Sequence, residues 1–197
     1  MEALNLTHGQ HKSPEDGMCL MEAVAYLGGE EHSDQPECAC PVISAFGRSL
    51  NDRMGVGVEG DALRAKYLVP LAEKLVGSLS TLGVEQKRAF FFADRAVRLF
   101  APLALESAGL KEEAARLRAL NEIVDEKTAQ DAAHAADNAA DAADAADAAS
   151  ASAWVAARVR GGTAHAAGCA ADAAAQAEAW EQAAKVLAEA CEIKGGE

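Results

Sequence analysis

Positive charge and aromatic side chains are scarce in this sequence of 197 residues, and long hydrophobic runs are missing. Lysine and arginine number 18 against 31 aspartate and glutamate residues, which gives a formal net charge of -13. A chain this acidic repels phosphate, so we expect no nucleic acid and no membrane among its main partners. No window is apolar over the length that spans a bilayer, and the chain does not start like a signal peptide. We therefore expect a cytoplasmic protein.

Aromatic residues make up only 5% of the chain, and alanine supplies much of the 50% that is hydrophobic. The large apolar side chains that can fill a core are concentrated before about residue 124. A chain of this length is too short for two full-sized domains. We predict a helical domain over residues 1–124 and an alanine-rich appendage over residues 125–197.

Strand-like alternation of apolar and polar residues is also missing, whereas apolar residues recur at helical spacing, so the predicted fold is all-α. The first helix is expected from Ser13-Pro14, a capping residue followed by proline, to Gly28. Later helices are expected to begin at Cys40-Pro41, at Asp61 with a break at Pro70, near Val84, and at Lys111.

Two details of this helical domain depend on local sequence. Residues 55–60 match the glycine spacing of a dinucleotide-binding loop, but they lack a preceding strand, and we predict a flexible loop. In the helix after Val84 we expect three phenylalanines in the core and three arginines on the wetter side. These residues are Phe90, Phe91, Phe92, Arg88, Arg95 and Arg98.

Residues 125–197 predict a long alanine-rich antiparallel helical hairpin that follows the helical bundle. Alanine has the highest helix propensity, and about three residues in five are alanine between Ala129 and Ala153. Gly161-Gly162 breaks the pattern, and Thr163 starts a second alanine-rich helix that reaches Cys191. Trp154, Val155, Val159, Trp180, Val186 and Leu187 supply the few large contacts between the two helices.

Histidine and cysteine are concentrated between His8 and Cys40, where we place the candidate chemistry. One hypothesis is nucleophilic catalysis by Cys19, with His11 as the base and Glu22 orienting it. The nucleophile would lie in the first turns of a helix, where the helix dipole favours a thiolate. His32 and Asp34 are the alternative base and orienting group.

A second hypothesis is a zinc site, because thiolates and imidazoles suit tetrahedral zinc. Its ligands would be Cys19, His32, Cys38 and Cys40, with His8, His11 or Glu22 as alternates. The sequence holds no C-x2-C pair, and buried thiols with surface histidines are the competing interpretation.

A third hypothesis involves no chemistry. Cys19 and Glu22 would belong to a buried hydrogen-bonded network that fixes the N-terminal segment against the bundle. Since the helix around Glu22 is otherwise apolar, its carboxylate needs donors, and Tyr26, His11 or an arginine could supply them.

The first 120 residues contain four distinctive motifs: His8-Gly-Gln-His11-Lys-Ser-Pro-Glu-Asp-Gly-Met-Cys19-Leu-Met-Glu22-Ala, His32-Ser-Asp34-Gln-Pro36, Cys38-Ala-Cys40-Pro41 and Arg48-Ser-Leu-Asn51-Asp52. In these motifs the chain resembles an uncharacterised family of small proteins from bacterial and phage genomes. Members of that family often end in alanine-rich tails. The resemblance implies architecture and a bacterial or phage origin, and it implies no reaction.

The function that we expect from these patterns is non-enzymatic. The chain would be an interaction or assembly protein whose alanine-rich hairpin mediates self-association or binds a protein partner. The alternative is a metal- or cysteine-dependent enzyme with its site between His8 and Cys40.

Overall fold

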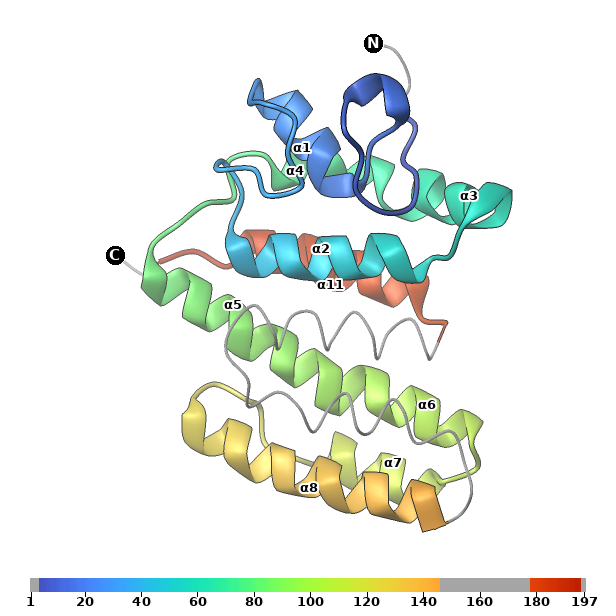
Figure 1. The fold of residues 1–197 in the computed structure, drawn as a ribbon. Coiled ribbons are helices and arrows are strands. Elements are labelled where there is room, and N and C mark those ends of the chain that lie inside the picture. The colour runs from blue at the N-terminus through green and yellow to red at the C-terminus, as the bar shows by residue number, and fades with distance from the viewer. Residues whose placement is uncertain (1–3, 146–177, 196–197) are drawn as a thin grey trace.

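The computed structural model describes residues 4–145 and 178–195, and these residues form an all-α fold (Figure 1). Within these two ranges the only β-type pairing is a single bridge between Leu6 and Met18. The predicted all-α class is confirmed. None of the described helices is long and apolar enough to cross a membrane.

The described helices follow one another with short connections. In chain order they are α1 (Leu20–Gly28), α2 (Pro41–Arg53), α3 (Gly57–Tyr67), α4 (Ala72–Leu75), α5 (Leu82–Arg95), a π-helical turn (Ala96–Phe100), α6 (Ala101–Ser107), α7 (Lys111–Arg118), α8 (Glu126–Ala145) and α11 (Trp180–Glu192). Short 3-10 turns cover Pro14–Asp16 and Val69–Leu71, and the second of these is the predicted break at Pro70.

The helices are stacked in tiers, as Figure 1 shows. The N-terminal segment, α1, α3 and α4 form the upper tier, and α2 lies beside α11 below them. The rod formed by α5, the π-helical turn and α6 crosses beneath this pair, and α7 and α8 form the opposite end. The rod therefore contacts both the α2–α11 pair and the α7–α8 end.

The core is organised around the contact between α2 and the central rod. The rings of Phe46 and Phe92 stack with their centroids 4.5 Å apart, and both side chains are fully buried. Phe90 and Phe91 are only partly buried at the edge of the core, so Phe92 is the main anchor of the three predicted phenylalanines. Aromatic pairs of this kind combine a large buried area with a specific geometry.

Arg88 was expected on the wetter side of this helix, and that expectation is wrong. Its side chain is only 3% exposed and donates to three carbonyl groups. Nε donates to Ala190 at 3.0 Å, Nη1 to Ser78 at 2.6 Å and Nη2 to Ile193 at 3.2 Å. Arg88 thereby fixes the end of α11 against α5, because these carbonyls would otherwise be buried or left at a helix end without partners.

The last helix belongs to the same core as the first 124 residues. Its inward side chains Ala183, Val186, Leu187 and Ala190 are all buried in the one hydrophobic cluster, and α11 contacts α2, α3, α4 and α5. The predicted domain boundary at residue 124 assigns α11 to the appendage. In the structure, the buried side chains of α11 complete the packing of the upper tiers.

The first helix begins later than its sequence signals predict. Pro14–Asp16 forms only a 3-10 turn, and Gly17 follows with φ of 120°. That conformation is accessible to glycine and interrupts the helix, while the N–H of Thr7 donates to the carbonyl of Met18 at 2.8 Å. The helix α1 then starts after Cys19, so the capping role expected for Ser13 falls to a cysteine.

The predicted loop over residues 55–60 is also incorrect, because α3 begins at Gly57 and the helix start expected at Asp61 lies within it. Arg64 explains the local structure. Its fully buried guanidinium donates to the carbonyls of Asn51 and Gly55 and pairs with Asp61. These bonds hold the α2–α3 turn in one conformation, and no sequence pattern announces them.

Gly60→Ala is expected to lower the free energy of unfolding by about 2 kcal/mol, because overpacking a well-packed site is destabilising. A Cβ at residue 60 would lie 2.5 Å from the carbonyl oxygen of Gly55 and 2.7 Å from that of Met54. The matched control is Gly83→Ala in α5, where a Cβ meets nothing within 4 Å. We expect the control to stabilise the chain by about 0.5–1 kcal/mol. Urea unfolding measures both, and equal effects would contradict the close packing at Gly60.

Most of the described alanine-rich residues are helical, as predicted, in α8 (Glu126–Ala145) and α11 (Trp180–Glu192). The helix α8 buries its alanines against α7, α5 and the π-helical turn. These buried residues are Ala132, Ala133, Ala136 and Ala139. The turn predicted at Gly161-Gly162, the helix start at Thr163 and the contacts of Trp154, Val155 and Val159 lie outside the described residues.

Candidate functional site

The N-terminal segment brings His11, and the loop after α1 brings His32, to the carboxylate of Glu22 in the first turn of α1. Nδ1 of His11 lies 2.8 Å from Oε2 of Glu22, and Nε2 of His32 lies 3.5 Å from Oε1. Glu22 is fully buried, whereas the two histidine side chains are 12% and 15% exposed. Three of the candidate residues are thus placed in one cluster.

Backbone N–H groups also bind the carboxylate of Glu22. The N–H of His11 donates to Oε1 at 2.7 Å, and the N–H of Cys19 donates to Oε2 at 2.7 Å. With the ring of His11, the carboxylate receives three close hydrogen bonds, the pattern required of a buried charge. Tyr26, a donor expected from its helical spacing, is instead 58% exposed.

These hydrogen bonds determine the charge of Glu22. Burial raises the pKa of the Glu22 carboxyl, but the hydrogen bonds from Cys19 and His11 outweigh that effect and leave the pKa below its ordinary value. The carboxylate is therefore ionised at neutral pH and complements the N-terminal end of the α1 dipole.

The second ring nitrogen of His11 contacts the side chain of Thr7, with Nε2 2.9 Å from Oγ1. In the neutral ring, Nδ1–H donates to Glu22 and Nε2 accepts from the hydroxyl of Thr7. Gly17 packs directly over this pair, since a Cβ there would lie 2.7 Å from Oγ1 of Thr7. The imidazole of His11 is thus fixed by Glu22 at one nitrogen, by Thr7 at the other, and by close packing of Gly17.

His32 completes the cluster through the backbone. Its Nε2 lies 3.1 Å from the carbonyl oxygen of His11, and its buried Nδ1 has no hydrogen-bond partner among the described residues. His32 therefore links the loop after α1 to the N-terminal segment.

Cys19 serves as the N-cap of α1. Its sulfur accepts the N–H of Glu22 at 3.5 Å while Glu22 accepts the N–H of Cys19, which is a capping box with sulfur in the usual place of a hydroxyl. Burial raises the pKa of the Cys19 thiol to about 12. The nucleophile hypothesis requires a thiolate, and a thiol with this pKa is protonated at neutral pH.

Cys38 and Cys40, the other two cysteines of the predicted zinc site, lie just before α2. The N–H of Cys38 donates to Glu30 at 2.7 Å, and burial raises the pKa of its thiol. The N–H of Cys40, the N-cap residue of α2, donates to the hydroxyl of Ser78 at 3.1 Å. Across residues 4–145 and 178–195, no three histidine, cysteine or acidic side chains are grouped as metal ligands would be. The zinc site stays a prediction.

Arg48, Asn51 and Asp52 of α2 bind the N-terminal segment and the loop after α1. The sequence patterns assigned them no role. Asn51 donates to the carbonyl of Thr7 and accepts the N–H of Leu20. Asp52 accepts the N–H of Gly9 at 3.1 Å, and Arg48 donates to the carbonyl of Asp34 at 2.8 Å. Arg48, Asn51 and Asp52 have the i, i+3, i+4 spacing of one helix face, and that spacing is the signal that could have identified them.

Acid is expected to weaken the fold through Glu22. Because its pKa is lower in the folded chain, its contribution to stability is complete above the ordinary value of about 4.5 and is lost as the pH falls through the folded value. The difference in free energy of unfolding between wild type and Glu22→Gln should therefore shrink between pH 5 and pH 3. Urea unfolding at each pH measures it, and a constant difference would mean that Glu22 does not titrate in this range.

The fold and this cluster define an all-α protein in which a buried carboxylate ties the N-terminal segment to the helices. No family model, no curated protein and no solved structure matches the chain. The functional argument therefore depends on the residues of this chain.

Proposed function

We propose that the chain is a non-enzymatic interaction or assembly protein whose alanine-rich hairpin mediates self-association or binds a protein partner. The observation that supports this proposal is that both described ends of the alanine-rich part are built into the core. The helix α8 buries its alanines against α7 and the central rod, and Arg88 fixes the end of α11. The described segments on either side of residues 146–177 thus belong to the core.

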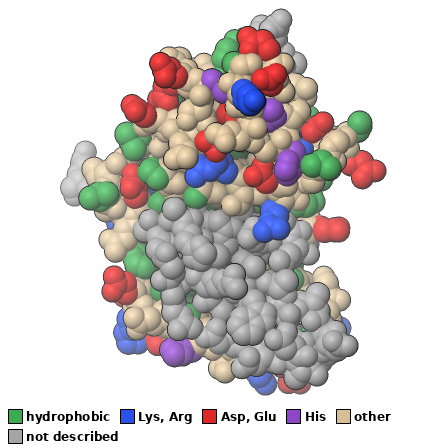
Figure 2. Space-filling model, viewed as in Figure 1, with side chains coloured by type: hydrophobic (Ala, Val, Ile, Leu, Met, Phe, Trp, Pro, Cys, Tyr) green, Lys and Arg blue, Asp and Glu red, His purple; other side chains and the backbone are tan. Residues whose placement is uncertain are grey.

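The alanine face of α8 is already used within the chain, so it is not the surface offered to a partner. The outward residues Asp131, His134 and Asn138 are exposed instead. Figure 2 shows acidic side chains over the upper and lower parts of the face that it presents. Because this chain has a net charge of -13, a different protein with basic residues meets less electrostatic repulsion from it than a second acidic surface does.

In this proposal the His11–Glu22–His32 cluster has a structural role. The carboxylate of Glu22 binds three donor groups on two residues, the N–H and ring of His11 and the N–H of Cys19. Such a network orders a segment that has few apolar residues of its own. The N-terminal segment is thereby ordered at the end of the fold opposite α8.

Replacing residues 146–177 by a glycine–serine segment of equal length tests the proposal. The variant should keep its helical circular dichroism and cooperative unfolding, because α8 and α11 remain, and it should lose any mass above the monomer in light scattering. A wild-type chain of monomeric mass would exclude self-association, and an unchanged oligomer in the variant would exclude the hairpin as its cause.

One observation favours the alternative, an enzyme with its site between His8 and Cys40. The ring of His11 is oriented by a buried carboxylate and contacts a hydroxyl, which is the arrangement of a general base. Elemental analysis of protein purified without an affinity tag tests the metal-dependent form. About one zinc per chain, lost in Cys38→Ser with little change in stability, would support it, and purified protein that contains no metal would count against it.

A further inference from the structure

Thr7, His11 and Glu22 are joined by a chain of hydrogen bonds that ends on a hydroxyl. Oε2 of Glu22 lies 2.8 Å from Nδ1 of His11, and Nε2 of the same ring lies 2.9 Å from Oγ1 of Thr7. The order is carboxylate, imidazole and hydroxyl, and both contacts are within hydrogen-bonding distance. Enzymes that use a hydroxyl as nucleophile connect it in this way to a base and to the group that orients the base.

The charge of Glu22 determines which atom of this chain carries each hydrogen. Because the pKa of Glu22 is below its ordinary value, its carboxylate is ionised and only accepts hydrogen bonds. Nδ1 of His11 therefore carries a hydrogen, and in the neutral ring Nε2 has a free lone pair. The hydroxyl of Thr7 is the partner of that nitrogen, so its hydrogen points at the base. A hydroxyl in this arrangement can lose its proton as it attacks.

The backbone of Thr7 is fixed from two sides. Its N–H donates to the carbonyl of Met18 at 2.8 Å, and its carbonyl accepts the side chain of Asn51 at 3.0 Å. A Cβ at Gly17 would lie 2.7 Å from Oγ1 of Thr7 and 3.1 Å from Nε2 of His11, so Gly17 packs closely against both groups. Thr7 is only half-buried, and the side chain of His11 is 12% exposed. The hydroxyl and its base are therefore held in place and are still open to solvent.

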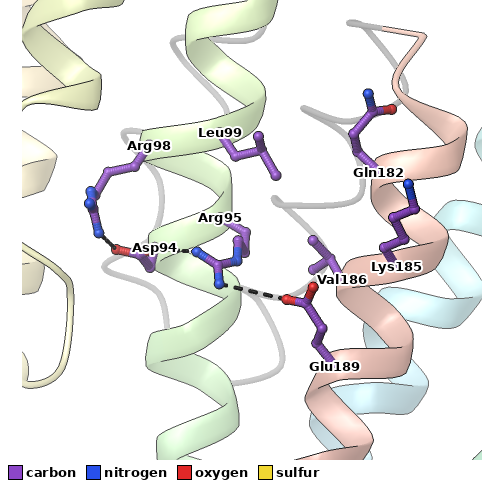
Figure 3. A pocket seen from close by; sticks show the side chains of 8 residues that line it. All are labelled: Asp94, Arg95, Arg98, Leu99, Gln182, Lys185, Val186 and Glu189. Carbon is purple, nitrogen blue, oxygen red and sulfur yellow. Dashed lines mark hydrogen bonds and ion pairs between the residues drawn. The ribbon is translucent and has the colours of Figure 1, made fainter.

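The charged side chains between α5 and α11 differ, because they are paired with one another. Figure 3 shows Arg95 between the carboxylates of Asp94 and Glu189, at 3.0 and 3.6 Å. Arg98 pairs with Asp94 at 2.8 Å. Each of these charges has a partner of opposite charge within the protein, whereas the chain of bonds at the N-terminal segment ends on a group that can react.

We propose that Thr7 is a nucleophile that takes small acyl groups from activated esters, with His11 as its base and Glu22 as a positioning residue. The inference goes beyond the assembly role, and it rests on the alternative enzyme function, for which it names a nucleophile and a substrate class. Thr7 takes the place of Cys19, which caps α1. None of these residues belongs to the alanine-rich part, so the chemistry does not depend on assembly.

The reaction transfers one acyl group and one proton. Oγ1 of Thr7 forms a bond to the carbonyl carbon of the ester while its proton passes to Nε2 of His11. The bond from that carbon to the leaving oxygen then breaks, and the imidazolium returns the proton to that oxygen. The buried carboxylate of Glu22 stabilises the imidazolium. The methyl group of Thr7 and the close packing of Gly17 crowd the hydroxyl, which favours a small acyl group such as acetyl.

Treatment of the full chain with p-nitrophenyl acetate tests the proposal, followed by acid quenching and peptide mass spectrometry. We expect an acetyl group on Thr7 and a burst of about one p-nitrophenolate per chain. Thr7→Val, which keeps the shape and lacks the hydroxyl, should abolish the burst, and Thr7→Ser should keep it. His11→Gln should slow acetylation about 100-fold. The control is His134→Gln, which removes an exposed imidazole on α8 and should change nothing.

The two Thr7 variants keep the test decisive if His11→Gln loosens the N-terminal segment, because the Thr7 hydroxyl bonds only to His11 among the described residues. Absence of an acetyl group on Thr7 would overturn the inference. An equal burst in the wild type and Thr7→Val would also overturn it, since another side chain would then be the nucleophile. Light scattering separates the two functions: a monomer that acetylates Thr7 contradicts self-association alone, and an oligomer that does not contradicts only this inference.

Discussion

A chain truncated after Val124 is expected to lose cooperative folding, although the sequence alone favours residues 1–124 as a self-sufficient domain. Truncation removes α11, whose Val186 and Leu187 are 3% and 0% exposed, and uncovers α2 and α5. It also leaves the guanidinium of Arg88 without two of its three carbonyl partners. The combined loss is of the order of 5–15 kcal/mol, the whole stability of a typical domain.

Far-UV circular dichroism and urea unfolding of the truncated chain measure this effect. A chain that ends at Gly195 is the control, because it keeps α11 and every carbonyl that binds Arg88, and it should unfold like the wild type. A truncated chain with a sharp unfolding transition near that of the wild type would show that the first 124 residues are stable alone and that α11 only covers them.

Glu22→Ala is expected to lower the free energy of unfolding by about 3–5 kcal/mol, the range for breaking a buried, hydrogen-bonded charge. The substitution leaves the N–H groups of His11 and Cys19 and the ring of His11 without their acceptor. The N-terminal segment should then loosen around His11, while the bonds of Thr7 and Gly9 to Met18, Asn51 and Asp52 remain.

Two glutamates in the adjoining loop are controls for Glu22, measured by the same urea unfolding. Glu31 is exposed, and Glu31→Ala should change the free energy of unfolding by less than about 0.5 kcal/mol. Glu30 accepts the N–H groups of Glu37 and Cys38, so Glu30→Ala should cost about 1 kcal/mol. Equal small effects at all three positions would mean that the network around Glu22 contributes nothing to stability.

The sequence was sufficient for features that depend on spacing. Helical periodicity predicted the all-α class, and the apolar helix around Glu22 predicted that its carboxylate needs donors, with His11 as one of three candidates. The helix start at Cys19 was missed because Ser13-Pro14 is the stronger capping signal. Only the pairing of Thr7 with Met18 and the backbone of Gly17 exclude a helix there.

The buried arginines could not be predicted from the sequence, because their partners are mainly backbone carbonyls. Arg64 and Arg88 bind carbonyl groups of residues that could be of almost any type, and only Asp61, three residues before Arg64, is a complementary side chain. An arginine in an amphipathic helix is most often exposed. Arg88 was expected to be exposed for this reason, and Arg64 was assigned no role. The same reason hid the roles of Asn51 and Arg48, which bind the backbone of the N-terminal segment and its neighbouring loop.

The position of α11 has a consequence for how the protein is made. Arg88 and Ala190 are 102 residues apart, and the core between α2 and α5 is closed only when the last helix is in place. During synthesis the preceding helices leave the ribosome with an uncovered apolar face, and this face stays open until α11 emerges. The core therefore closes late, because contacts this distant in sequence form slowly. Expression at low temperature, which slows aggregation of the incomplete chain, should raise the soluble yield of the full-length protein.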